Sequence, residues 1–152
     1  MMNAGRRAWA AASTGLRGVG QVVFQEDPVT GLCFLAGVAL NSLFGAAAML
    51  LGAILGTTTA QLLGFRAGQV RAGLFGFNGA LVGVGAVAFF GPGPSSVAMI
   101  VVGAPASALV MRGMLRLPVP PFTAPFVVVT WILCAAGSAL GLPAGAPMSG
   151  PT

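Results

Sequence analysis

The segment PVTGLCFLAGVALNSLFGAAAMLLGAILGTTTAQLLGF, residues 28–65, contains no acidic or basic side chain. Glu26 and Asp27 precede it, and Arg66 follows it. Because a helix that crosses a bilayer needs about 20 apolar residues, this segment is long enough for two spans. The uncharged stretch at 72–111 has room for two more, and the stretch from 117 to the end has room for one. The sequence therefore predicts an all-α integral membrane protein with five transmembrane helices.

The composition excludes a water-soluble globular domain. Hydrophobic residues make up 57% of the 152 residues and charged residues only 6%, whereas about a quarter of a soluble domain is charged. The 24 glycines are typical of closely packed membrane helices. The net charge of +5 comes from arginines close to the short connectors, which indicates membrane orientation rather than nucleic-acid binding.

Turn-forming residues divide the uncharged stretches into spans. We expect spans at 28–40, 44–63, 73–90, 97–115 and 122–140. A turn at 41–42, a Gly/Pro loop at 91–95 and a Pro-rich connector at 118–121 separate them, since proline interrupts a helix and glycine permits tight turns. The tail at 141–152 is rich in Gly and Pro and is predicted to be disordered.

The first 25 residues divide into an N-terminal segment at 1–15 and a short apolar segment at 16–25. A secretory signal peptide is disfavoured, because Ser13, Thr14 and Arg17 interrupt the apolar run. Residues 16–25 are too few to span a bilayer and too apolar for a solvated tail. We therefore expect a re-entrant or interfacial helix ahead of the five spans.

The arginines predict the orientation of the bundle. Arg66 and Arg71 lie between the second and third spans, and Arg112 and Arg116 lie near the connector between the fourth and fifth. With five spans, both connectors fall on the same side as the N-terminus. By the positive-inside rule, the N-terminus is expected in the cytoplasm and the protein in the plasma (inner) membrane.

Enzymatic activity has little basis in the sequence. There is no histidine, and no cluster of cysteines and histidines has the spacing of a metal site, so we expect neither a metal nor a cofactor. Cys33 and Cys134 fall inside predicted spans and are interpreted as small apolar residues. A dinucleotide-type pattern at 83–88 lies within an apolar span and is treated as a chance match.

Three segments carry a resemblance to a known family. They are LRGVGQVVFQEDPVTGL at 16–32, GLFGFNGALVG at 73–83 and LPVPPFTAPF at 117–126. In this order and spacing they resemble the urea transporters of bacteria and animals. The resemblance covers residues 16–140 and implies channel-like, passive transport of urea or a similar small neutral solute.

The chain resembles only half of such a transporter. Family members usually contain two homologous halves, each a re-entrant pore helix followed by five spans, inserted in opposite orientations around one pore. The resemblance therefore implies that a second half-repeat completes the pore, as an inverted-repeat partner. That partner is a complementary chain or an inverted homodimer, and higher oligomers are possible on this interpretation. The alternative function is a non-conducting structural or regulatory subunit of a urea or small-amide transporter.

Six residues match the pore-lining positions of the family. Urea is planar, neutral and rich in hydrogen-bonding groups, so a selective pore needs amide, hydroxyl and carbonyl groups between flat apolar walls. By resemblance, the substrate pore is lined by Gln21, Val22, Phe24, Phe77, Leu81 and Thr123.

Several of these residues have an alternative interpretation. Gln21 could hydrogen-bond a neighbouring helix, and Phe24 and Phe77 could face lipid or the core. Asn78 is expected to brace the interrupted backbone of a neighbour. The Gly-x-x-x-Gly patterns at 52–56 and 79–83 are interpreted as packing devices.

The acidic pair departs from the family pattern, which tends to have neutral residues there. One interpretation is that Glu26 and Asp27 are solvated at a membrane boundary. The other is that one carboxylate guards the pore entrance or pairs with Arg17.

Overall fold

The computed structural model describes residues 4–142, without the side chains of residues 4, 6–8 and 11. Within this range every regular element is helical and no strand is present, which confirms the all-α class. The elements in chain order are α1 (Ala4–Gly20), the 3-10 helix η1 (Gln21–Val23), α2 (Pro28–Asn41), α3 (Leu43–Leu62), α4 (Ala67–Arg71), α5 (Gly76–Phe90), α6 (Pro94–Met114) and α7 (Ala124–Ala139). Most of the tail predicted to be disordered, residues 143–152, lies outside the described residues.

Two helices, α3 and α6, are long and apolar enough to cross a bilayer, with 20 and 21 residues. Residues 12–23 and α2 pass the same test together, although their axes differ by 72° across the break between them. The helices α5 and α7 are apolar but shorter, at 15 and 16 residues. The described residues therefore contain two helices of spanning length, or three if the bent pair is one span.

Short polar residues fix where α2 and α3 begin. Pro28 is in the first turn of α2, and the Asp27 carboxylate accepts a hydrogen bond from the Thr30 amide at 2.9 Å. Only Ser42 separates α2 from α3, and its hydroxyl accepts a hydrogen bond from the Gly45 amide at 3.0 Å. These side chains satisfy amides that the first turn of a helix leaves without a partner. The helix break predicted at 41–42 is confirmed.

The loop after α5 is shorter than the sequence predicts. The expected loop runs to residue 95, but α6 already begins at Pro94. Proline fits the first turn of a helix, where its missing N–H is not needed. The Ser96 hydroxyl donates to the Gly93 carbonyl oxygen at 2.8 Å and accepts from the Gly93 amide at 3.2 Å, which caps the helix start.

The N-terminal helix is longer than the segment expected at 16–25. Helix α1 starts well before residue 16, and η1 continues it for one short turn. Phe24 then adopts a left-handed backbone with a φ of 59°, which ends the helical run before α2. Where α1 crosses α2, a Cβ at Gly31 would collide with the Leu16 carbonyl oxygen. Close backbone packing therefore holds the bend between the two helices.

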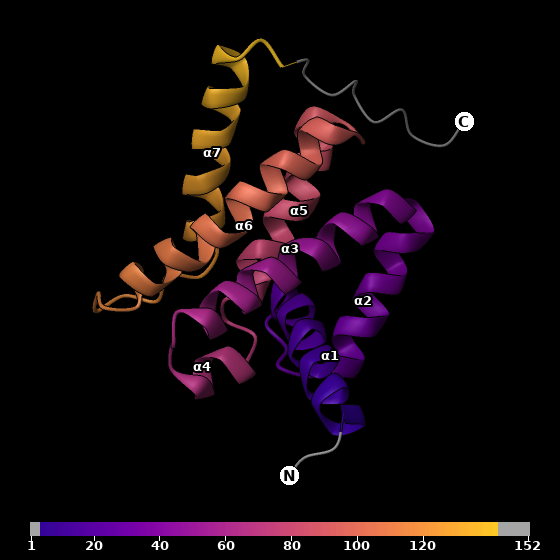
Figure 1. Ribbon diagram of the computed structural model, residues 1–152, viewed down its shortest axis with the longest axis vertical. Coiled ribbons are helices and arrows are strands. Elements are labelled where there is room, and N and C mark those ends of the chain that lie inside the picture. The colour runs from indigo at the N-terminus through magenta and orange to yellow at the C-terminus, as the bar shows by residue number, and fades with distance from the viewer. Residues whose placement is uncertain (1–3, 143–152) are drawn as a thin grey trace.

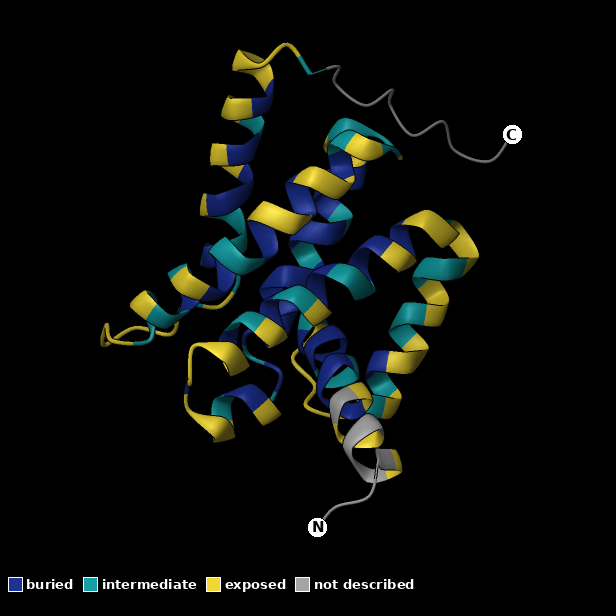
Figure 2. Cartoon of the chain, viewed as in Figure 1, coloured by how far each residue is buried: buried dark blue, intermediate teal, exposed yellow. Residues whose placement is uncertain are grey.

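The core lies where α3, α5 and α6 cross, and it contains the dark blue, buried residues in the middle of Figure 2. Helices α3 and α5 meet along a line of small residues. A Cβ added to Gly52 would collide with the Gly79 carbonyl oxygen, and one added to Gly83 would collide with that of Ala48. The two Gly-x-x-x-Gly patterns are thus confirmed as packing devices, since only glycine permits this approach.

The two ends of the bundle carry different connectors (Figure 1). The turn between α2 and α3, the loop between α5 and α6 and the C-terminal end of α7 lie towards the upper end of the view. Helix α4 and the connector between α6 and α7 lie towards the lower end. Arg66, Arg112 and Arg116 line one cavity there. Arginines of both connectors therefore meet at one end of the bundle, as the sequence predicts, while Arg71 lines a different cavity.

Candidate pore site

Three interruptions of the helices are tied together by side-chain amides. They are η1, the turn that precedes α5 and the connector that precedes α7. Gln21 links the first two, because its amide nitrogen donates to the Ala72 carbonyl oxygen at 2.9 Å. Asn78 links the second and third through Phe122 and Phe126. The three segments that carry the predicted pore residues thus converge in space.

The buried side chain of Gln21 makes the kind of contact that its alternative interpretation anticipates. The hydrogen bond to Ala72 holds η1 against the turn before α5. An amide has two N–H donors and one carbonyl acceptor, so this bond uses only part of its capacity. A pore-lining role for Gln21 would rest on the second donor and the oxygen, and it stays a prediction.

Phe24 and Phe122 form an exposed aromatic pair. Their ring centroids are 6.1 Å apart at an interplanar angle of 86°, the edge-to-face arrangement that aromatic rings favour. The side chains are 65% and 56% exposed. Both residues have positive φ angles, 59° and 43°, which a non-glycine residue rarely adopts. The backbone at both helix breaks therefore turns a large apolar ring outwards. We call this pair the aromatic rim.

Phe77, Val22 and Leu81 are less exposed than the aromatic rim. Phe77 is only 4% exposed and belongs to a cluster of buried hydrophobic residues, against which the half-buried Val22 and Leu81 pack. In the isolated chain Phe77 therefore fills the core, as its alternative interpretation anticipates. Val22 and Leu81 keep part of their surface accessible, so a pore-lining role for them stays a prediction.

Thr123 lies at the start of α7, next to the aromatic rim. It is half-buried and occupies the N-cap position, but its side chain makes no capping hydrogen bond. Its hydroxyl is therefore not used to start α7. A threonine hydroxyl beside a helix break can offer both a donor and an acceptor to a polar solute.

Asn78 braces the interrupted backbone of a neighbour, as the sequence predicts. It is fully buried in α5, and its amide nitrogen donates to the Phe122 carbonyl oxygen at 3.3 Å. Its side-chain oxygen accepts a hydrogen bond from the Phe126 amide at 3.0 Å. One side chain thus satisfies a donor and an acceptor at the broken start of α7, where backbone partners are missing.

Sequence reasoning missed Phe122 as a site residue. The sequence places it at the start of the fifth span and inside the third family-like segment, but not among the pore residues, whereas the structure pairs it with Phe24. A local signal existed, because Phe122 follows two prolines and therefore sits at a helix break. Phe24 stands likewise just before Pro28 and the start of α2. Phe24 and Phe122 therefore share one feature in the sequence: each is an aromatic residue close to a predicted helix break.

The two acidic residues have separate positions. Asp27 caps α2 through the Thr30 amide. Glu26 lines a cavity of about 320 Å³ together with Arg17 and Arg71. Arg17 also donates to the Arg71 carbonyl oxygen at 3.4 Å. Glu26 therefore lies among basic residues close to η1, and its role at a pore entrance stays a prediction.

Comparison with known proteins identifies the family. The family model described as urea transporter matches residues 12–151, which is nearly the whole chain. No curated protein matched the chain. The family match covers all three segments that converge at the aromatic rim and its supporting amides. The chain therefore belongs to the urea transporter family, a family of membrane transport proteins rather than enzymes.

Proposed function

We propose that this chain forms one half of a pore that conducts urea passively across the plasma membrane, and that a second half-repeat completes the pore. The observation that carries this proposal is the exposed aromatic rim of Phe24 and Phe122. Two rings held beside broken helices offer flat apolar walls to a planar solute. Membership of the urea transporter family supports urea as the solute.

The residues around the rim suit a neutral, polar solute. Urea leaving water needs partners for its N–H groups and its carbonyl oxygen, because an unpaired polar group in an apolar site is costly. The Thr123 hydroxyl and the oxygen of Gln21 are the side-chain groups that we assign to this task. The lining is completed by Val22 and Leu81, with Phe77 behind them, once the partner half closes the slot.

Transport through this pore is independent of ion gradients. The sequence has no histidine, and its two acids, Glu26 and Asp27, stand together just before α2 rather than along a path through the membrane. Proton-coupled carriers need titratable groups inside the membrane that take up and release the proton. The chain offers no such relay, so the solute moves down its own gradient.

The proposed topology has five spans, α2, α3, α5, α6 and α7, with α1 and η1 as the re-entrant pore helix. The sharp bend between α1 and α2 supports a helix that enters the bilayer and turns back. The short helices α5 and α7 each follow a non-helical segment, which together with the helix can extend through the hydrocarbon layer. Such irregular backbone is tolerated at membrane depth where protein packs around it, and Asn78 supplies that packing for α7.

Urea flux from vesicles tests the proposal. Purified chain is reconstituted into proteoliposomes, where insertion from detergent permits both orientations and therefore inverted pairs. We expect saturable urea flux that does not change when proton or sodium gradients are collapsed. Phe24→Ala should lower the flux and admit bulkier analogues, whereas Phe89→Ala, a matched exposed phenylalanine at the far end of α5, should not.

Each other outcome has a definite meaning. Flux that requires an ion gradient would refute the passive pore. Equal flux and selectivity in the Phe24→Ala and Phe89→Ala variants would remove the aromatic rim from the pathway. Vesicles without any urea flux would favour the alternative function, a non-conducting structural or regulatory subunit.

Labelling of single cysteines tests the orientation and the partner. In a variant lacking Cys33 and Cys134, the substitutions Asn41→Cys and Val119→Cys place one thiol at each end of the bundle without changing a charge. Both positions are exposed. The arginine bias predicts that cells expose only the thiol at 41, with the N-terminus cytoplasmic. Equal labelling of both positions from outside would instead establish two orientations and favour the inverted homodimer over a complementary chain.

A further inference from the structure

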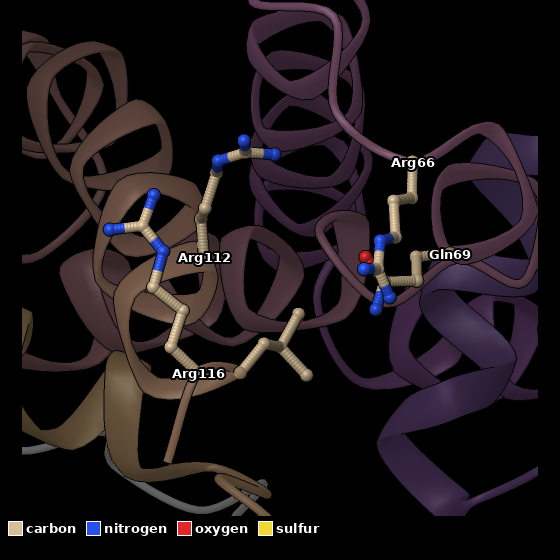
Figure 3. A pocket seen from close by; sticks show the side chains of 5 residues that line it. Arg66, Gln69, Arg112 and Arg116 are labelled. Atoms are coloured by element: carbon tan, nitrogen blue, oxygen red, sulfur yellow. The ribbon is translucent and has the colours of Figure 1, made fainter.

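A basic cavity lies outside the proposed pore, at the end of the bundle where the two arginine-bearing connectors meet. It has a volume of about 390 Å³. Figure 3 shows the side chains of Arg112 and Arg116 on one wall and those of Arg66 and Gln69 on the opposite wall. Three guanidinium groups from segments far apart in the sequence therefore share one space.

Among the residues that the structure describes, no carboxylate lines this cavity. The sequence contains two acidic residues. Asp27 is engaged at the start of α2, and Glu26 lines the other cavity with Arg17 and Arg71. Since like charges repel and an arginine stays charged at any ordinary pH, the three guanidinium groups create a positive potential that favours a bound anion.

One of the three arginines is held in place. The guanidinium carbon of Arg112 lies 4.3 Å from the centroid of the Phe65 ring, a cation–π contact. Phe65 is itself buried and packs against Phe75 at a centroid distance of 5.0 Å. Stacking covers the face of the guanidinium and leaves its N–H groups at the edge, where they can form paired hydrogen bonds to a phosphate.

The position of the cavity indicates the source of the anion. Its lining residues belong to the segment that follows α3 and to the C-terminal end of α6 with the residues after it. Because α3 and α6 are the two helices of full spanning length, we place the cavity at the level of the lipid headgroups. One apolar side chain, Leu115, lines the cavity. Exposed leucines also lie close in sequence to the lining arginines, namely Leu62, Leu63 and Leu117. Charged N–H groups thus stand beside apolar side chains that acyl chains can cover.

We propose that this cavity binds the phosphate of an anionic phospholipid, with Arg112, Arg116 and Arg66 as its ligands. Basic pockets between membrane helices bind anionic headgroups in this way, and the proposed cytoplasmic side is the one where such lipids are concentrated. The site is separate from the aromatic rim. It requires that the chain resides in a membrane, but it does not depend on urea conduction.

Lipid binding by the purified full chain tests the proposal. Native mass spectrometry in neutral detergent measures the retention of phosphatidylglycerol and of phosphatidylcholine with the same acyl chains, so orientation in a membrane has no influence. We expect preferential retention of phosphatidylglycerol. Arg116→Gln should weaken its binding about fivefold, the effect of one basic residue near an anionic lipid. Because Arg116 is exposed, this variant should fold normally.

Two further variants separate a built site from general attraction. Arg71→Gln is the matched control. It also removes one positive charge, from the connector that carries Arg66, but Arg71 lines the cavity of Glu26 and Arg17 instead. This variant should retain phosphatidylglycerol like the unchanged chain. Arg112→Lys keeps the charge but loses the planar fork, and we expect it to bind more weakly than the unchanged chain.

Three results would overturn the proposal. Equal losses in Arg71→Gln and Arg116→Gln would mean diffuse electrostatic attraction rather than a site. Equal retention of phosphatidylcholine would mean that the headgroup charge is irrelevant. Displacement of phosphatidylglycerol by inorganic phosphate at about the same concentration as the lipid would identify a site for a free anion. Urea flux that is unchanged in Arg116→Gln would agree with a site outside the pore, whereas lost flux would contradict that separation.

Discussion

The contact between α3 and α5 and the aromatic rim are built in opposite ways. Along the first, Gly52 and Gly79 bring two backbones so close that neither position has room for a Cβ. At the second, Phe24 and Phe122 present two of the largest apolar side chains to the outside. The glycines pack within one chain, whereas the two rings are mostly exposed and meet each other edge to face.

The contact between α3 and α5 is complete within one chain, whereas the aromatic rim still has exposed apolar surface. A membrane helix gains little from hiding apolar surface from lipid, so close van der Waals contact must hold α3 and α5 together. The aromatic rim, in contrast, is mostly exposed. This exposed surface is the one that we propose to receive a second half-repeat and a solute between the halves.

The largest expected effect is at the contact between α3 and α5. Gly52→Leu would force the two helices apart, and we expect no folded, monodisperse protein in detergent. Gly37→Leu in α2 is the control, because nothing lies within 4 Å of a Cβ at that position. Size-exclusion chromatography and thermal unfolding compare the two. A normally folded Gly52→Leu variant would show that this contact does not hold the bundle together.

A pair of phenylalanines sharpens the comparison between core and rim. Phe77→Ala should lower the free energy of unfolding by about 3–5 kcal/mol, because it leaves a cavity in a buried cluster. Phe24→Ala should change it by less than about 1 kcal/mol, since the ring is mostly exposed. Denaturant unfolding in detergent measures both. Equal destabilisation by the two variants would contradict the division between core and rim.

Asn78 connects the core to the rim, and its loss should have an intermediate effect. Asn78→Ala leaves the Phe126 amide and the Phe122 carbonyl oxygen without their partner, which should destabilise the fold by about 1–3 kcal/mol. Asn78→Asp should be worse, since it also buries a charge. Asn41→Ala, at an exposed position, is the control. Thermal unfolding gives the order, and similar stability of all three variants would exclude a bracing role.

The smallest expected effect is at a buried hydroxyl. Within the described part of the chain the Thr57 hydroxyl has no hydrogen-bond partner, so Thr57→Val should be neutral or stabilising by less than about 1 kcal/mol. Thr59→Val should be destabilising, because its hydroxyl donates to the Leu55 carbonyl oxygen at 2.8 Å. Thermal unfolding measures the stability of both variants, and both substitutions lie in α3. A strongly destabilised Thr57→Val variant would reveal a polar contact that this conformation lacks.

Much of the fold could be predicted because membrane helices follow from local composition. Uncharged runs of sufficient length predict helices, and proline or short polar residues predict where they end. The turn at Ser42 was predicted in this way. The start of α6 was not, since Pro94 reads equally well as part of a loop or as the first turn of a helix.

The candidate site could be predicted only in part. The resemblance identified the three segments, and the bracing role of Asn78 followed from its being a lone polar residue in an apolar helix. The exposure of individual rings did not follow. Phe24 and Phe77 have the same side chain and the same match to the family, yet one is exposed and the other is buried.

The sequence by itself determined the helical class, the membrane environment and the positions of most breaks, because these depend on hydrophobicity and on backbone restrictions that act locally. Only the tertiary structure decided that Phe122 pairs with Phe24 and that Arg66 shares a cavity with Arg112. The physical reason is that these contacts join residues far apart in the chain. Their geometry depends on how closely glycines let the helices approach and on which backbone groups the amides of Gln21 and Asn78 reach.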